Sequence, residues 1–148
     1  MLMARMAVAV FAAFFIALSA AAEQTTYPVT KIVDGDTIKA LVNEQVETVR
    51  LIGIDTPEVH RRTKPVECFR IEASNHAKTL LSGKQVRLEA DPSQADRDRY
   101  RRLLRYVFLP DGTHINRKMI EDGFAHEYTY NLPYKYQAEF KAGTARGP

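Results

Sequence analysis

Short stretches of alternating apolar and polar residues, separated by turn-forming pairs, restrict the fold of this chain more than any other feature. Their period of two and their β-branched content predict strands. Three of them follow one another near the start: Tyr27 to Val33, Thr37 to Val42 and Val46 to Ile54. The Asp34-Gly35 pair after the first is typical of a hairpin turn. Thr56-Pro57 ends the third, because proline cannot donate a ladder hydrogen bond.

The period of the pattern changes in the remainder of the chain. Glu67 to Leu81 has apolar positions spaced as on one face of a helix, and Gly83 follows where a helix end favours glycine. Two more predicted strands come next: Lys84 to Ala90 and Leu103 to Leu109. Short helices are predicted from Asn116, as the capping residue, to Asp122 and from Pro133 to Lys141, with an irregular tail over 143–148.

The predicted order is three strands, one helix, two strands and then short helices. Strands joined as consecutive hairpins leave unpaired edges, and closure into a barrel removes those edges. The predicted fold class is therefore α+β, mainly β: an OB-fold five-stranded barrel with a helix between strands 3 and 4 and short C-terminal helices. Barrels of this kind commonly bind nucleic acids or sugars.

The first 22 residues differ from the rest of the chain. Arg5 precedes an apolar run from Met6 to Leu18, and small residues from Ser19 to Ala22 complete the pattern of a secretory signal peptide. A membrane anchor is the alternative, but the apolar run is shorter than the ~20 residues that span a bilayer. We therefore expect residues 1–22 to be removed and residues 23–148 to form one secreted or periplasmic domain, without stable membrane association.

Composition alone excludes few classes of protein function. The chain has 148 residues and a net charge of +3, which is too small to indicate a polyanionic partner. The single cysteine, Cys68, allows no disulfide within the chain. Basic residues are nevertheless concentrated in one run, with arginines at positions 97, 99, 101, 102 and 105. A solvated surface is the usual explanation of such a run, and it stays open at this point.

Ionisable residues gather at the ends of the predicted strands. Asp36 lies in the first turn, and Asp55 and Glu58 flank the end of the third strand. Arg50 is a charge inside that apolar strand, where it needs either a carboxylate neighbour or a bound anion. Arg102 stands where the last predicted strand begins. An internal salt bridge and a binding site both remain open as explanations.

These residue types suit a phosphodiester and a hard cation. The carboxylates of Asp36 and Asp55 are ligands that calcium prefers, whereas the scattered histidines give no zinc pattern. A cation held there would polarise a phosphoryl oxygen. Arg50 and Arg102 could bind phosphate oxygens in a bidentate way. Glu58 could orient or deprotonate an attacking water.

Three motifs together resemble the staphylococcal nuclease (thermonuclease) family. They are Val33-Asp34-Gly35-Asp36-Thr37, Arg50-Leu51-Ile52-Gly53-Ile54-Asp55-Thr56-Pro57-Glu58 and Asp98-Arg99-Tyr100-Arg101-Arg102. The resemblance extends from Thr30 to about Lys141. It implies an OB-fold endonuclease that depends on calcium, attacks DNA and RNA with water, and leaves 3′-phosphate ends.

The same resemblance implies a role for each matched position. The catalytic positions are Arg50, Glu58 and Arg102. The metal-binding positions are Asp36, Asp55 and, through its backbone carbonyl, Thr56, with Asp34 as a support behind them. The nucleotide-binding positions are Tyr100, Tyr128 and Tyr130, since stacking on aromatic rings tolerates any base. DNA and RNA are then the expected partners, and the chain is expected to act as a monomer.

Two features depart from the family pattern. The family usually has glycine before its second catalytic arginine, whereas this chain has Arg101, which could reshape the turn or add a phosphate contact. The family's last helix normally continues to a tryptophan, but this chain has none, and its helix is expected to break at Gly143. A catalytically impaired nucleic-acid-binding module is therefore the alternative. A structural domain whose charges form only salt bridges is a third possibility.

Overall fold

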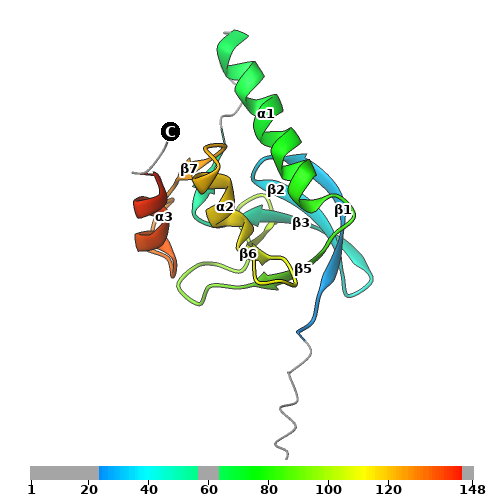
Figure 1. Ribbon diagram of the computed structural model, residues 1–148. Helices are drawn as coiled ribbons and strands as arrows, with labels where there is room; N and C mark the ends of the chain where they lie inside the picture. The colour runs from blue at the N-terminus through cyan, green and yellow to red at the C-terminus, as the bar shows by residue number, and fades with distance from the viewer. Residues whose placement is uncertain (1–23, 57–63, 145–148) are drawn as a thin grey trace, which may run out of the picture.

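Five strands close into a small barrel in the computed structural model, which describes residues 24–56 and 64–144, without the side chains of residues 64–69 (Figure 1). Their order around the barrel is β1-β2-β3-β6-β5. Their bounds are Tyr27–Asp34 for β1, Thr37–Val42 for β2, Gln45–Leu51 for β3, Gln85–Glu89 for β5 and Leu103–Phe108 for β6. Helix α1, Lys64–Leu81, lies between the third and fourth of them in the sequence. The predicted OB-fold is thus confirmed.

Strand pairing explains how the barrel closes. Consecutive hairpins pair β1 with β2 and β2 with β3, all antiparallel. β3 then runs parallel to β6, which pairs antiparallel with β5, and β5 returns to β1. The parallel step places Arg50 of β3 beside Leu104 of β6. Residues that are distant in the sequence therefore meet at the ends of β3 and β6.

The core fills the barrel and continues under the short C-terminal helices. Inward residues of the strands, such as Ile38, Val49 and Val107, are almost fully buried. The largest buried side chains are Tyr106 of β6 and Phe140 of α3, Gln137–Thr144. Burial of each large apolar side chain contributes about 1.5–3 kcal/mol relative to its exposure. This core replaces the disulfides that the chain cannot form.

The predicted third strand is wrong at its end. β3 stops at Leu51, and a separate short strand, β4 (Ile54–Asp55), pairs with β7 (His126–Glu127), which the sequence did not predict. The break occurs at Gly53, whose φ is +79°. A Cβ atom there would lie 2.5 Å from the Tyr134 ring, so both the backbone and the packing require glycine. After the turn, the carboxylate of Asp55 lies 3.0 Å from Arg50 of β3.

The helices also differ from the prediction at their ends. Helix α1 begins at Lys64, three residues before the predicted start, and carries Pro65 in its first turn, where the missing N–H costs nothing. Helix α3 begins at Gln137 and not at Pro133, and it continues through Gly143 to Thr144. The predicted break at Gly143 is therefore wrong.

Asn116 was predicted to cap the short helix α2, and this prediction is also wrong. The helix spans Ile115–Glu121, and His114 occupies the cap position without a side-chain hydrogen bond. Asn116 is instead fully buried inside the first turn. Its Oδ1 accepts a hydrogen bond from Val107 N at 2.9 Å, and its Nδ2 donates to Ile52 O at 2.9 Å. The amide thus joins α2 to both strands that meet at the barrel end.

Residues 1–22, the predicted signal peptide, lie outside the described residues. The division of the chain into residues 1–22 and a domain over 23–148 therefore stays a prediction. Within residues 24–56 and 64–144, no helix is both long enough and apolar enough to cross a membrane.

Candidate functional site

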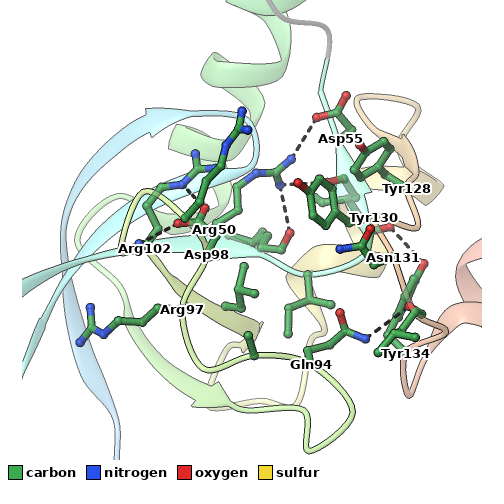
Figure 2. Close-up of a pocket in the computed structure, with 18 of the residues that line it drawn as sticks. Arg50, Asp55, Gln94, Arg97, Asp98, Arg102, Tyr128, Tyr130, Asn131 and Tyr134 are labelled. Atoms are coloured by element: carbon green, nitrogen blue, oxygen red, sulfur yellow. Dashed lines mark hydrogen bonds and ion pairs between the residues drawn. The ribbon is translucent and has the colours of Figure 1, made fainter.

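An open pocket of about 660 Å³ lies at the barrel end where β3 and β6 meet (Figure 2). Its floor comes from the segment around the β3–β4 break. One wall comes from the loop before β6 and the other from the segment that follows β7. Figure 2 shows Arg102 and Asp98 on one side, Tyr128 and Tyr130 on the other, and Arg50 between them. The pocket thus brings together residues from three separate parts of the sequence.

Asp36 is buried beside this floor, with only 4% of its surface exposed. Its Oδ2 accepts hydrogen bonds from the backbone N and the hydroxyl of Thr56, both at 2.9 Å. Its Oδ1 accepts one from Thr37 Oγ1 at 3.0 Å. Gly35 makes this contact possible, because a Cβ atom there would lie 2.7 Å from the Thr56 methyl carbon. The carboxylate is therefore held in one orientation by its neighbours.

Arg50 joins two carboxylates. Its Nη2 lies 3.0 Å from Asp55 Oδ1 and 3.2 Å from Asp36 Oδ2. Its Nη1 donates to the carbonyls of Leu51 at 3.0 Å and Ile54 at 2.9 Å. The internal salt bridge that the sequence left open is therefore present. The Nε of Arg50 has no hydrogen-bond partner among the described residues, so an anion can still be bound there.

Asp34, which lies next to Asp36, has a raised pKa. Burial raises the pKa of Asp34 to about 6, and repulsion from Asp36 adds to the rise. Asp34 also accepts a hydrogen bond from the Asp36 backbone N at 3.2 Å. Asp34 therefore contacts the backbone of a predicted metal-binding residue, and its supporting role stays a prediction.

The donor set fits a hard cation. The oxygens of Asp36 and Asp55 approach the same guanidinium nitrogen of Arg50, so they can converge on one positive centre. Within the described residues, no group of three or more His, Cys, Asp or Glu side chains could hold a metal ion. Further ligands would therefore be backbone carbonyls, such as that of Thr56, and water, which calcium accepts readily.

Arg102 is positioned by a tight turn. The backbone N of Arg101 donates to Asp98 O at 2.9 Å, and Asp98 N donates to Arg102 O at 3.0 Å. Asp98 Oδ1 accepts a hydrogen bond from Arg102 N, and its Oδ2 accepts one from Arg102 Nε at 2.7 Å. Burial opposes ionisation, but these hydrogen bonds from Arg102 outweigh it and lower the pKa of Asp98. Among the described residues, the two terminal nitrogens of Arg102 make no hydrogen bond, so they can bind a phosphate.

Arg101, the departure from the family pattern, has a φ of +64°. Residues 98–101 form a tight turn whose last residue, Arg101, has a left-handed backbone. This position favours glycine. A residue with a Cβ atom pays about 1–2 kcal/mol for this conformation. The arginine is therefore accommodated at an energetic cost, and the turn that positions Arg102 keeps its shape.

The three predicted nucleotide-binding tyrosines all line the pocket. Tyr100 and Tyr130 are 64% and 68% exposed, which is unusual for aromatic side chains outside a binding surface. The rings of Tyr128 and Tyr130 lie with their centroids 6.4 Å apart. The guanidinium of Arg102 lies 5.3 Å from the centroid of the Tyr100 ring, within cation–π range.

Sequence reasoning missed the residues that brace this pocket. Asp91 is buried and accepts hydrogen bonds from Tyr106 Oη at 2.6 Å, Lys135 N at 2.8 Å and Ser93. Burial opposes ionisation, but these bonds together lower its pKa to about 2. Tyr134 Oη lies 3.1 Å from Gly53 O and so ties the third segment to the floor. No local pattern marks either residue, because their partners are distant in the sequence.

Glu58, the predicted catalytic base, lies outside the described residues. Its place relative to Arg50 and Arg102 therefore stays a prediction. Of the other predicted positions, Asp36 and Asp55 contact Arg50, whereas Asp34 and Thr56 contact Asp36. They come from the β1–β2 turn and from β4 with the residue after it.

Comparison with known proteins supports the resemblance that the motifs suggested. A family model described as Staphylococcal nuclease homologue matches residues 48–146. The chain belongs to the staphylococcal nuclease family. The match includes Arg50, Asp55, Glu58 and Arg102, whereas Asp36 lies before its start.

Curated relatives of this family member include named nucleases. It is 41% identical over 116 residues to a thermonuclease of Staphylococcus hyicus, covering 78% of this chain and 67% of that protein. It is 38% identical over 112 residues to the SPbeta prophage-derived endonuclease YokF of Bacillus subtilis, covering 75% of this chain and 37% of that protein. It is 35% identical to endonuclease YncB of the same organism, covering 75% and 52%. The chain thus spans between 37% and 67% of the length of these three relatives.

Proposed function

We propose that this chain is a calcium-dependent nuclease that hydrolyses phosphodiester bonds of DNA and RNA and leaves 3′-phosphate ends. One observation supports this most strongly. Arg50 joins Asp55 at the pocket floor to the buried Asp36 beside it, and Arg102 lines the wall of the same pocket. Asp98 holds Arg102 through its Nε, so the salt bridge leaves the two terminal nitrogens as donors for a phosphate.

Arg102 and Arg50 would act on the phosphate. The Nε of Arg102 is held by Asp98, so its two terminal nitrogens form a fixed fork that matches two phosphate oxygens. Positive groups fixed in advance stabilise the charge that grows in the transition state without reorganising at that moment. Arg50 would add its Nε from the floor. Both side chains are mostly shielded from water, which strengthens their interaction with an anion.

Asp36, Asp55 and the carbonyl of Thr56 would hold the calcium ion. A bound calcium ion supplies Lewis-acid polarisation of a phosphoryl oxygen. Glu58 would orient or deprotonate the attacking water, as the family motif implies. Tyr100, Tyr128 and Tyr130 would hold the flanking nucleoside by stacking, which does not select a particular base.

The same proposal covers the fate of the chain. Residues 1–22 would direct export and be removed, and residues 23–148 would act as a monomeric secreted or periplasmic domain. The single cysteine allows no disulfide within the chain, so the exported domain would depend on its buried core for stability.

The test is cleavage of plasmid DNA and of RNA by the full chain, first in calcium and then after addition of a calcium chelator. We expect cleavage in calcium, loss of cleavage after chelation, and 3′-phosphate ends on the fragments. Retained DNA binding without cleavage would replace the enzyme by a binding module. Neither binding nor cleavage would leave only a structural role for the charges.

A further inference from the structure

The arginines from position 97 to position 105, in the loop before β6 and in β6 itself, divide into those with and those without a salt bridge. Arg97 makes a bidentate salt bridge to Glu47, with both contacts at 2.9 Å. Arg105 pairs with Asp96 at 2.6 Å, and Arg102 pairs with Asp98 at 2.7 Å. Among the described residues, Arg99 and Arg101 form no salt bridge. Arg99 instead donates to Tyr100 Oη at 2.6 Å, whereas the Arg101 side chain makes no hydrogen bond among the described residues.

Arg101 differs from Arg99 in where its charge lies. Arg97, Asp98, Arg99, Tyr100 and Arg102 all line the pocket, but Arg101 between them does not. Its side chain is exposed and its backbone is left-handed, with a φ of +64°. Arg101 is therefore an exposed residue that adjoins pocket-lining residues on both sides without lining the pocket itself, and we call this position the rim.

The rim position is rigid. Arg97 Nη1 donates to the Arg101 carbonyl at 2.9 Å, and the Arg101 backbone N is held by Asp98 O. Arg97 is itself fixed to Glu47 on β3. A strained residue persists only where its surroundings hold it, and such residues concentrate at sites with a function.

We propose that Arg101 is an additional contact for the substrate strand, binding a phosphate of a nucleotide that lies outside the pocket. The proposal rests on the proposed nuclease function. The proposed ligand is a long single-stranded polyanion, because a ligand confined to the pocket contacts only the lining residues, and Arg101 is not one of them. Arg101 would raise affinity for long substrates and leave the chemical step on short ones unchanged.

The test compares Arg101→Asn with Arg101→Lys in the full chain. Asparagine tolerates the left-handed backbone and removes the charge, whereas lysine keeps the charge on the same backbone. Binding of a 20-nucleotide single-stranded DNA is measured by fluorescence anisotropy across a salt series. Cleavage of a thymidine dinucleotide is measured in parallel.

We expect Arg101→Asn to weaken binding of the 20-mer about two- to fivefold, the usual range for one exposed ion pair. The slope of log affinity against log salt should become shallower by ~0.7, the value for one contact with a single-strand phosphate. Arg101→Lys should keep the wild-type slope, and the kcat for the dinucleotide should stay within about twofold of wild type in both variants.

An unchanged slope in Arg101→Asn would overturn this proposal, and so would an equal loss on the dinucleotide, which would indicate an effect through Arg102. Equal losses in the lysine and asparagine variants would also overturn it, since charge would then not be the cause. If the wild type cleaves DNA but the salt slope of Arg101→Asn equals that of the wild type, only the proposed Arg101 contact is refuted. A wild-type chain that neither binds the 20-mer nor cleaves removes the proposed function as well.

Discussion

Gly35→Ala tests whether close packing behind Asp36 sets the geometry of the site. A Cβ atom at Gly35 would lie 2.7 Å from Thr56 Cγ2 and 3.0 Å from Ala73 Cβ, so the neighbours must shift. Overpacking of this kind typically costs about 1–3 kcal/mol. Displacement of Thr56 would also weaken its two 2.9 Å hydrogen bonds to Asp36. Bonds to charged groups contribute about 1.5–3 kcal/mol each, but a small displacement weakens them without breaking them, so we expect a total loss of about 2–4 kcal/mol in the free energy of unfolding.

The assay is urea unfolding followed by circular dichroism, together with plasmid cleavage at saturating calcium. Thr56→Ser deletes the Cγ2 methyl and keeps the hydroxyl, so the double variant with Gly35→Ala should recover a large part of the lost stability and activity. Gly143→Ala is the matched control. It lies in α3, where alanine is favoured over glycine by about 0.5–1 kcal/mol, and its Cβ would meet Ile120 at 3.2 Å. Wild-type stability in Gly35→Ala, or no recovery in the double variant, would refute the packing argument.

Four further predictions concern the core, the titration of a buried group and the chemistry. Asn116→Leu should lower the free energy of unfolding by about 2–5 kcal/mol in urea titration, because it leaves two buried backbone groups without partners. The control, Asn75→Leu at an exposed position, should change this free energy by less than about 0.5 kcal/mol. Burial lowers the pKa of His114 to about 4, below its value in the unfolded chain. The contribution of His114 to the free energy of unfolding should therefore be fully present above pH 6.5, and this free energy should fall by about 3 kcal/mol as the pH drops to 4. His114→Phe should flatten that part of the pH profile of unfolding. Arg102→Lys should reduce kcat nearly as much as Arg102→Ala, since the fork geometry is lost, and near-normal activity of the lysine variant would show that charge alone matters. Glu58→Gln should lose most of kcat with little change in calcium affinity measured by calorimetry.

The barrel was predictable because its signals are local. Each strand of the first three carries its own alternation, and Asp34-Gly35 specifies the turn between two of them. The break at Gly53 was not predictable in the same way. Its cause is the approach of the Tyr134 ring from the far end of the chain, and β7 exists only because β4 is freed to pair with it. Long-range contacts of this kind leave no period in the sequence.

The candidate site also combines residues that local sequence patterns predicted with residues whose partners are distant in the sequence. Arg50 was predicted because an arginine inside an apolar strand requires a partner, and Asp36 and Asp55 because carboxylates at two turns suit a hard cation. The structure adds that Arg50 is the partner of both carboxylates. Asp98 was not predicted as the residue that holds Arg102, and Asp91 was not predicted as the brace of the pocket wall. Asn116 was given a local role as a helix cap, whereas its buried amide serves partners in β6 and beside Gly53.

The most direct test of the central claim is calcium binding and plasmid cleavage, measured together on the wild-type chain and on Asp36→Asn. If Asp36 binds the cation with Arg50 beside it, the variant should lose calcium affinity and cleavage together. It should keep a cooperative unfolding transition. The wild type should stop cutting when calcium is chelated. Cleavage by the wild type that persists without a divalent cation, or full activity of folded Asp36→Asn, would contradict the account.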